Sequence, residues 1–182
     1  MSEATKFGKD IPLIFRELNE DTKKYLSEYT CGNMGIDDHF HEKAINDKST
    51  TTFLFIDKEE SRAITCVSLS CSRIDYVHSI HGHESTSAFE IKFFATDEDY
   101  QKRPYDENNT TTLSKSIMNI LIVFLKNTCR KYIGATHIVL YSVPKAKNFY
   151  LDCGFLEFEE YMEKKEEHFT HDCIPMYMPL DY

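Results

Sequence analysis

The fold is decided by the stretch VPKAKNFYLDCGF, residues 143–155, which follows the apolar run at residues 138–140. Pro144 suits the first turn of a helix, because the N–H that proline lacks would have no helical partner there. Gly154 suits the position just after a helix, where a positive φ is needed and glycine adopts it at little cost. The stretch therefore predicts a strand, a short helix and another strand, in that order.

Length and composition are typical of a globular protein. The 182 residues suffice for a sizeable core, and we expect a single domain over residues 1–182. Hydrophobic residues make up 41% of the chain, and no apolar run approaches the ~18 residues of a membrane span. The first residues carry no apolar signal segment, and none of the cysteines forms a C-x-x-C pair. We therefore expect a cytoplasmic protein with reduced thiols and no membrane partner.

Hydrophobic periodicity predicts a mixed order of strands and helices. Strand patterns occupy residues 12–16, 51–56, 62–76, 88–95, 138–140, 155–161 and 174–180. Capping residues predict helices from Asn19 or Asp21 to about Tyr29, from Ile36 to Ile45, from Thr112 or Ser114 to near Gly134, and after Pro144. The polar segments at 97–112 and 163–171 are expected to be loops.

Three pieces of the sequence together resemble one known superfamily. Residues 146–155 fit the pattern A-x-x-F-Y-x-x-x-G-F, residues 89–96 form an apolar strand followed by Tyr100-Gln101, and residues 174–178 form a closing strand. In their order and spacing these pieces resemble the GNAT superfamily of acyl-CoA N-acyltransferases over essentially the whole chain. The resemblance implies a mixed α/β (α+β) fold with a twisted, mostly antiparallel sheet of six to seven strands and about four flanking helices.

The resemblance also implies an activity, which is transfer of an acetyl group from acetyl-CoA to an amine within a ternary complex, without a metal. In the family the tyrosine of the Phe-Tyr pair faces the thioester sulfur, which assigns that role to Tyr150. A phenol has a reference pKa of about 10 and a thiol about 8.5, so a protonated tyrosine can donate to the departing thiolate. By analogy the backbone of Phe94, Ala95 and Thr96 would hold the pantetheine arm, and Asn148 would meet a polar group of the cofactor. Glu90 lies where some members place a general base.

The sequence departs from the family at the loop that binds the pyrophosphate of coenzyme A. That loop normally contains glycines and exposes consecutive N–H groups at a helix N-terminus. Counted from Gln101, the glycine positions fall on Pro104 and Asp106. Proline has no N–H to donate, and the aspartate carboxylate would repel a phosphate. A second register treats the residues between Gln101 and Asn109 as an insertion and places the loop at residues 109–114. In that register, which we prefer, the binding residues are Thr112, Leu113, Ser114 and Lys115.

The sequence leaves the acceptor open among a small amine, a protein amino group and aminoacyl-tRNA. Residues 31–38 resemble the start of the GNAT toxins that modify aminoacyl-tRNA, whereas the net charge of −9 disfavours a nucleic-acid partner. An alternative interpretation is a non-catalytic binding protein with the GNAT fold, because the phosphate loop has lost its glycines. A homodimer is also left open.

Histidines gather at two places, and neither predicts a metal site. His78, His81 and His83 lie near Glu84, and His168 and His171 lie near Asp172, but their spacing matches no zinc signature. We therefore expect no metal. Cys31 has no histidine partner that the sequence identifies, which favours a structural thiol over a nucleophile.

Overall fold

The computed structural model describes residues 9, 11–78, 82–108, 110–163 and 172–180. The fold is mixed α/β, with an eight-stranded, mostly antiparallel sheet whose strands pair in the order β1-β2-β3-β4-β5-β8-β6, while β7 pairs with β3. The strands are β1 (Leu13–Glu17), β2 (Thr51–Asp57), β3 (Arg62–His78), β4 (Gly82–Thr96), β5 (His137–Ser142), β6 (Leu156–Glu157), β7 (Met162–Glu163) and β8 (Ile174–Pro179). The α-helices are α1 (Met34–Asp38), α2 (Leu113–Tyr132) and α3 (Lys147–Asp152).

The chain forms two compact units, and the long strands β3 and β4 pass through both of them. The first unit comprises residues up to Ser68 and residues 93–120, and the second comprises residues 69–92 and those from Leu121 onward. Each unit is described by itself below. The mixed class and the antiparallel sheet that the sequence predicts are confirmed, with one strand more and one α-helix fewer in the described part of the chain than expected.

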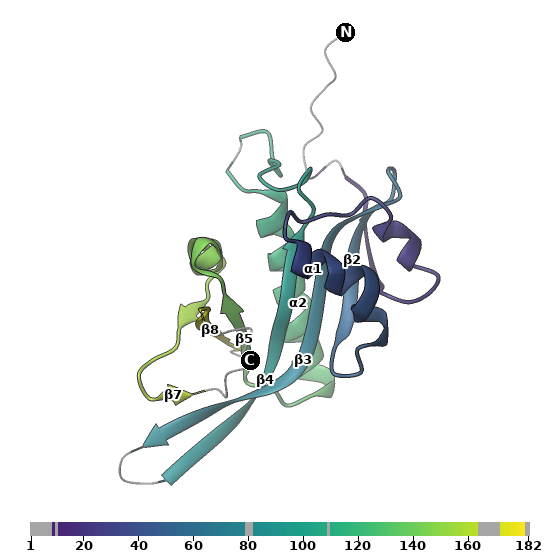
Figure 1. Cartoon of the computed structure of the whole chain (residues 1–182). Coiled ribbons are helices and arrows are strands. Elements are labelled where there is room, and N and C mark those ends of the chain that lie inside the picture. The colour runs from purple at the N-terminus through teal and green to yellow at the C-terminus, as the bar shows by residue number, and fades with distance from the viewer. Residues whose placement is uncertain (1–8, 10, 79–81, 109, 164–171, 181–182) are drawn as a thin grey trace. The chain divides into compact units, whose positions relative to one another are not determined.

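In the first unit, short helical segments and strands of the sheet share one hydrophobic core. β1 pairs antiparallel with β2, from Leu13↔Asp57 to Glu17↔Phe53. The core joins residues of the strands with residues of the helical segments and of the loop before α1. The strand residues are Leu54, Ile56, Ala63, Cys66 and Ala95, the helical residues are Leu26, Phe40 and Ala44, and the loop residue is Tyr29. Figure 1 shows α1 lying against the strands of this unit. Burial of these apolar side chains is the main stabilising contribution here.

The two helices predicted before β2 form only in part. The first is reduced to a 3-10 turn, η2 (Lys23–Leu26), although Asn19 does accept the N–H groups of Asp21 and Thr22, as a capping residue would. The second begins at Met34, because the Asn33 side chain accepts the N–H groups of Gly35 and Ile36. It continues as a π-helical turn, η3 (His39–Lys43), and ends in the 3-10 turn η4 (Ala44–Asn46).

In the second unit, β4 pairs parallel with β5 from Ala88↔His137 to Ile91↔Leu140, and β5 pairs antiparallel with β8. The core of this unit contains Ile74, Ala88, Val139 and Tyr177. The strand predicted over residues 155–161 is wrong in extent, because only the two-residue strand β6 forms within that range and β7 begins after it, at Met162. After the N–H of Phe158 bonds to the Pro175 carbonyl, the chain turns at Glu159 and joins β3 instead of following β8.

The stretch at 143–155 folds as predicted. Pro144 opens the 3-10 turn η5 (Pro144–Ala146), which runs into α3. At the end of α3 the Phe155 N–H donates to the Tyr150 carbonyl and the Gly154 N–H to the Leu151 carbonyl, which is the Schellman pattern. This pattern requires a left-handed residue after the cap, and Gly154 provides it with φ +91°.

The predicted loop is confirmed at residues 97–108 and 110–112, as is the long helix after it. None of the described helices combines the length and the apolar character that crossing a bilayer requires.

Candidate functional site

Tyr150 lies on α3 in apolar surroundings. Only 8% of the residue is exposed, and its ring contacts Phe149 and Phe155 edge-on, with centroids 5.1 and 5.8 Å away. Burial raises the pKa of the Tyr150 phenol far above its ordinary value, and the thiols of Cys153 and Cys173 add to the effect. No described residue is hydrogen-bonded to its hydroxyl. The phenol is therefore protonated at neutral pH, as a proton donor must be.

The other two predicted residues of the second unit differ in burial. Glu90 is 9% exposed on β4, and its Oε2 accepts a hydrogen bond from the Ser70 hydroxyl at 3.3 Å. Asn148 is exposed on α3, next to Lys147, which forms an ion pair with Glu157 at 2.7 Å. A carboxylate in this position can accept a proton, as a general base must. The general-base role of Glu90 and the cofactor contact of Asn148 both stay predictions.

In the first unit, side chains from other segments hold the end of β4. The carbonyl of Ala95 accepts a hydrogen bond from the Tyr29 hydroxyl at 2.8 Å. The carbonyl of Thr96 accepts one from the Gln101 side-chain amide at 2.9 Å, and the Thr96 hydroxyl pairs with that of Thr65. Phe94, the third predicted residue of this strand end, is half-buried. The backbone that would hold the pantetheine arm is thus fixed by its own unit.

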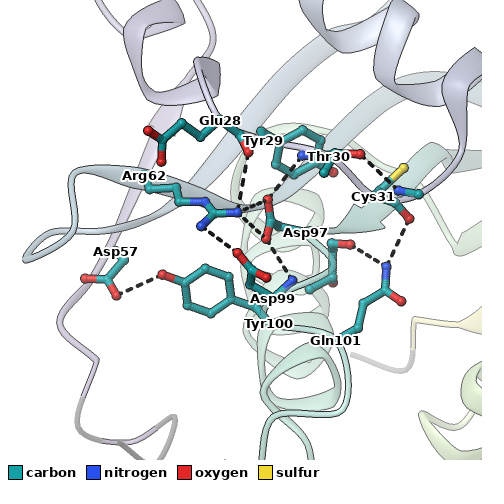
Figure 2. Close-up of polar contacts among 12 residues, drawn as sticks. Glu28, Tyr29, Thr30, Cys31, Asp57, Arg62, Asp97, Asp99, Tyr100 and Gln101 are labelled. Carbon is teal, nitrogen blue, oxygen red and sulfur yellow. Dashed lines mark hydrogen bonds and ion pairs between the residues drawn. The ribbon is translucent and has the colours of Figure 1, made fainter.

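A buried ion pair anchors the turn that follows β4 (Figure 2). Asp97 is fully buried, and both of its carboxylate oxygens lie 2.8 Å from Nη2 of Arg62. Asp99 contacts the other terminal nitrogen of Arg62, also at 2.8 Å. Burial opposes the charge of Arg62, but the hydrogen bonds to Asp97 and Asp99 outweigh it and raise the pKa of the guanidinium. Asp97 also accepts the N–H of Thr30, which ties the turn to the loop before α1.

That loop explains the Cys-Gly pair of the sequence. Gly32 has φ +78°, and a Cβ atom there would collide with the carboxylate of Glu98. The neighbouring Cys31 has its pKa raised to about 12 by burial, and also by a hydrogen bond to Asp37. A thiol with such a pKa holds almost no thiolate at neutral pH, which favours the structural role that we expected for Cys31.

The start of α2 is where the preferred register places the phosphate loop. Thr112 caps the helix, as predicted, because its hydroxyl accepts the N–H of Lys115 at 3.3 Å. The N–H of Leu113 donates to the Arg103 carbonyl at 2.9 Å, and the Leu113 side chain is fully buried. Of the first three helical N–H groups, only that of Ser114 has no partner among the described residues. This helix start therefore offers a phosphate fewer free donors than a glycine-rich loop does.

The insertion before α2 is a closed loop. Pro104 pairs with Thr112 in an antiparallel bridge, and the Tyr105 N–H donates to the Thr111 carbonyl at 2.9 Å. Asp106 accepts both the N–H and the hydroxyl of Thr110, and these hydrogen bonds lower the pKa of its carboxyl. Asn109 lies outside the described residues.

In the described part of the chain, no group of three or more His, Cys, Asp or Glu side chains is arranged to hold a metal ion. Residues 79–81, and so His81, lie outside the described residues, as do His168 and His171.

The sequence did not identify the group of residues around Asp97. Tyr29, Arg62 and Asp97 have partners 35 to 67 residues away along the chain, and no spacing pattern reports such pairs. The only available signal was the run Asp97-Glu98-Asp99 directly after a buried strand, which is an unusual place for three carboxylates.

No family model and no curated protein sequence matches the chain. Solved structures do match, and they show that the chain has the fold of the GNAT superfamily. A structure described as a bacterial toxin has a TM-score of 0.69 at 14% identity, covering 93% of this chain and 92% of that chain. AtaTR bound with acetyl-CoA has a TM-score of 0.71 at 11% identity, covering 92% and 94%. AtaT complexed with acetyl-methionyl-tRNAfMet has a TM-score of 0.68 at 13% identity, also covering 92% and 94%.

Proposed function

We propose that the chain is a cytoplasmic N-acetyltransferase that moves an acetyl group from acetyl-CoA to an amine. The observation that carries the proposal is Tyr150, a buried and protonated phenol within a stretch that fits the acetyltransferase signature and folds as that signature requires. The fold supports the proposal, because one of the similar structures was solved with acetyl-CoA, and the match covers more than nine tenths of each of the two chains.

In the proposed reaction the neutral acceptor nitrogen attacks the thioester carbonyl carbon, and a C–N bond and an oxyanion form. The oxyanion then collapses, the C–S bond breaks, and coenzyme A leaves as a thiolate. The nitrogen loses its extra proton to water or to Glu90. Tyr150 donates its own proton to the thiolate and regains one from water, so that the phenol is protonated again for the next turnover. Holding the reactants in line supplies most of the acceleration, because good orientation can lower the activation free energy by about 7–11 kcal/mol.

Most of the residues proposed to hold acetyl-CoA belong to the first unit. The backbone of Phe94, Ala95 and Thr96 would accompany the pantetheine arm. The start of α2, with the Ser114 N–H and the Lys115 side chain, would face the pyrophosphate, since a helix N-terminus attracts anions. Asn148 would meet a further polar group of the cofactor.

Among acceptors, we place the amino group of aminoacyl-tRNA first. AtaT, with which this chain shares its fold, was solved with acetyl-methionyl-tRNAfMet. The net charge of −9 opposes this choice, because phosphate binding needs cations. Incubation with labelled acetyl-CoA and either charged tRNA, an N-terminal peptide or a polyamine separates the three acceptor classes by which one becomes labelled.

One structural observation favours a second candidate, a GNAT-fold protein without catalysis. Two of the three N–H groups at the start of α2 are already bonded within the protein. Calorimetry with acetyl-CoA decides between the two. The enzyme requires measurable binding of acetyl-CoA. A dissociation constant above about 1 mM, which corresponds to a binding free energy of less than about 4 kcal/mol, would reject the enzyme.

A further inference from the structure

We infer that Tyr29 and Gln101 are positioning residues that present the N–H of Thr96 as the hydrogen-bond donor to the oxyanion. The inference rests on the proposed function, because it names which backbone group of the β4 end acts in the reaction and what holds it. It stands on contacts within the first unit alone.

The direction of the Thr96 N–H follows from its neighbour. The N–H of Asp97 donates to the Ile64 carbonyl at 2.8 Å and so points toward β3. A trans peptide group is planar, so the Thr96 carbonyl in that group points the opposite way. In an extended residue the N–H and the carbonyl lie on the same side of the strand. Both polar backbone groups of Thr96 therefore lie on the edge of β4 that faces away from β3.

Gln101 engages one of these two groups. Its side-chain amide donates to the Thr96 carbonyl at 2.9 Å and to the Cys31 carbonyl at 3.1 Å. Figure 2 shows Gln101 reaching across to Cys31. A free carbonyl on this edge would repel a developing oxyanion. Because Gln101 engages the Thr96 carbonyl, the N–H of Thr96 is the group that this residue offers to an anion.

Tyr29 fixes the same N–H from the other end of its peptide group. The Tyr29 hydroxyl donates to the Ala95 carbonyl at 2.8 Å, and Tyr29 is 2% exposed. The Ala95 carbonyl and the Thr96 N–H belong to one planar peptide group, so holding the first sets the direction of the second. Burial raises the pKa of the Tyr29 phenol, and the nearby Cys66 adds to the effect, so the hydroxyl remains a donor.

Both positioning residues sit on segments that are themselves held. The Thr30 N–H donates to the buried carboxylate of Asp97, and the Thr30 carbonyl accepts the N–H of Glu98 at 2.8 Å. The Arg62 guanidinium fixes Asp97 at 2.8 Å. Preorganised donors of this kind cost no reorganisation when charge develops, which is what oxyanion stabilisation requires.

The first test is Tyr29→Phe, which removes only the hydroxyl and keeps the ring packed on Phe40. Loss of an oxyanion donor costs about 10²–10³-fold in kcat, and loosening one costs less, so we expect kcat to fall about tenfold. We expect the KM for acetyl-CoA to change less than about twofold, because the interaction acts on the transition state. The assay is acetyl transfer from acetyl-CoA to aminoacylated tRNA.

Tyr100→Phe is the matched control. Tyr100 is also 2% exposed, and its hydroxyl donates to Asp57 at 3.3 Å, away from the β4 carbonyls. Both variants lose one buried tyrosine hydroxyl, so a merely structural role for Tyr29 predicts equal effects on activity. We expect Tyr100→Phe to lower the unfolding temperature as much as Tyr29→Phe does, with kcat unchanged.

Gln101→Met is the second variant, and because Gln101 is exposed it keeps the test valid should Tyr29→Phe fail to fold. It retains the length of the side chain without its donors, and we expect the same fall in kcat. In amide NMR spectra we expect the Thr96 signal of the wild type to shift on titration with acetyl-CoA, and to shift less in both variants.

The outcomes separate this inference from the function on which it rests. If the wild type binds no acetyl-CoA, the proposed function fails and the inference fails with it. If the wild type transfers acetyl groups but Tyr29→Phe and Gln101→Met keep its kcat, only the inference is overturned. The same holds if the Thr96 amide signal does not respond to acetyl-CoA in an active wild type.

Discussion

The α3 stretch and the turn after β4 are built in opposite ways. Tyr150 is placed by contacts within residues 143–155, where Pro144 starts the helical segment and Gly154 ends it. Asp97 is placed by Arg62 and Thr30, which lie far away in the sequence. The first region is apolar around Tyr150, whereas the second is a network of charges and amides. A local signature can therefore point to the proposed proton donor, but not to the residues that hold the β4 backbone.

The largest effect on stability is expected at Asp97. In Asp97→Asn the guanidinium of Arg62 loses its buried counter-ion, and breaking a buried pair by removing one partner costs about 3–5 kcal/mol. Urea denaturation measures the loss. Asp99→Asn is the control, because Asp99 contacts the same arginine but its side chain is 71% exposed, and we expect less than about 1 kcal/mol. Equal losses in both variants would contradict the account of the turn.

Glycine substitutions compare the two regions directly. Gly154→Ala and Gly32→Ala each place a side chain at a positive φ, which costs about 1–2 kcal/mol. Gly134→Ala is the control, because Gly134 is not among the glycines with positive φ and a Cβ there would meet nothing within 4 Å. We expect the control to change the free energy of unfolding by less than about 1 kcal/mol. A control as damaging as the other two would show that the cost is not conformational.

A smaller effect is expected at the start of α2, and it separates binding from folding. In Ser114→Asp the new carboxylate repels the pyrophosphate, and we expect acetyl-CoA affinity to fall about tenfold, or about 1.4 kcal/mol. The same carboxylate interacts favourably with the helix dipole, so the unfolding temperature should not fall. Ser114→Ala controls for loss of the hydroxyl. Unchanged affinity in Ser114→Asp would reject the preferred register of the phosphate loop.

The sequence predicts what depends on neighbouring residues. The cap at Thr112, the Schellman end at Gly154 and the long strands follow from local residue types and periodicity. The strand expected over residues 155–161 is shorter because the chain leaves β8 for β3, a choice between two sheet edges that no local pattern records. The proposed roles of Tyr29 and Gln101 rest on hydrogen bonds to the carbonyls of Ala95 and Thr96, and a sequence does not show which backbone carbonyls a side chain will reach.

The most direct test of the central claim is kcat for acetyl transfer in Tyr150→Phe at saturating acetyl-CoA. Because the phenol is the proposed proton donor, we expect kcat to fall about 10²-fold or more while the dissociation constant of acetyl-CoA stays within about twofold. Since burial raises the pKa of Tyr150, the wild-type rate should show no loss from its ionisation below about pH 10. A Tyr150→Phe variant with the wild-type kcat would contradict the account.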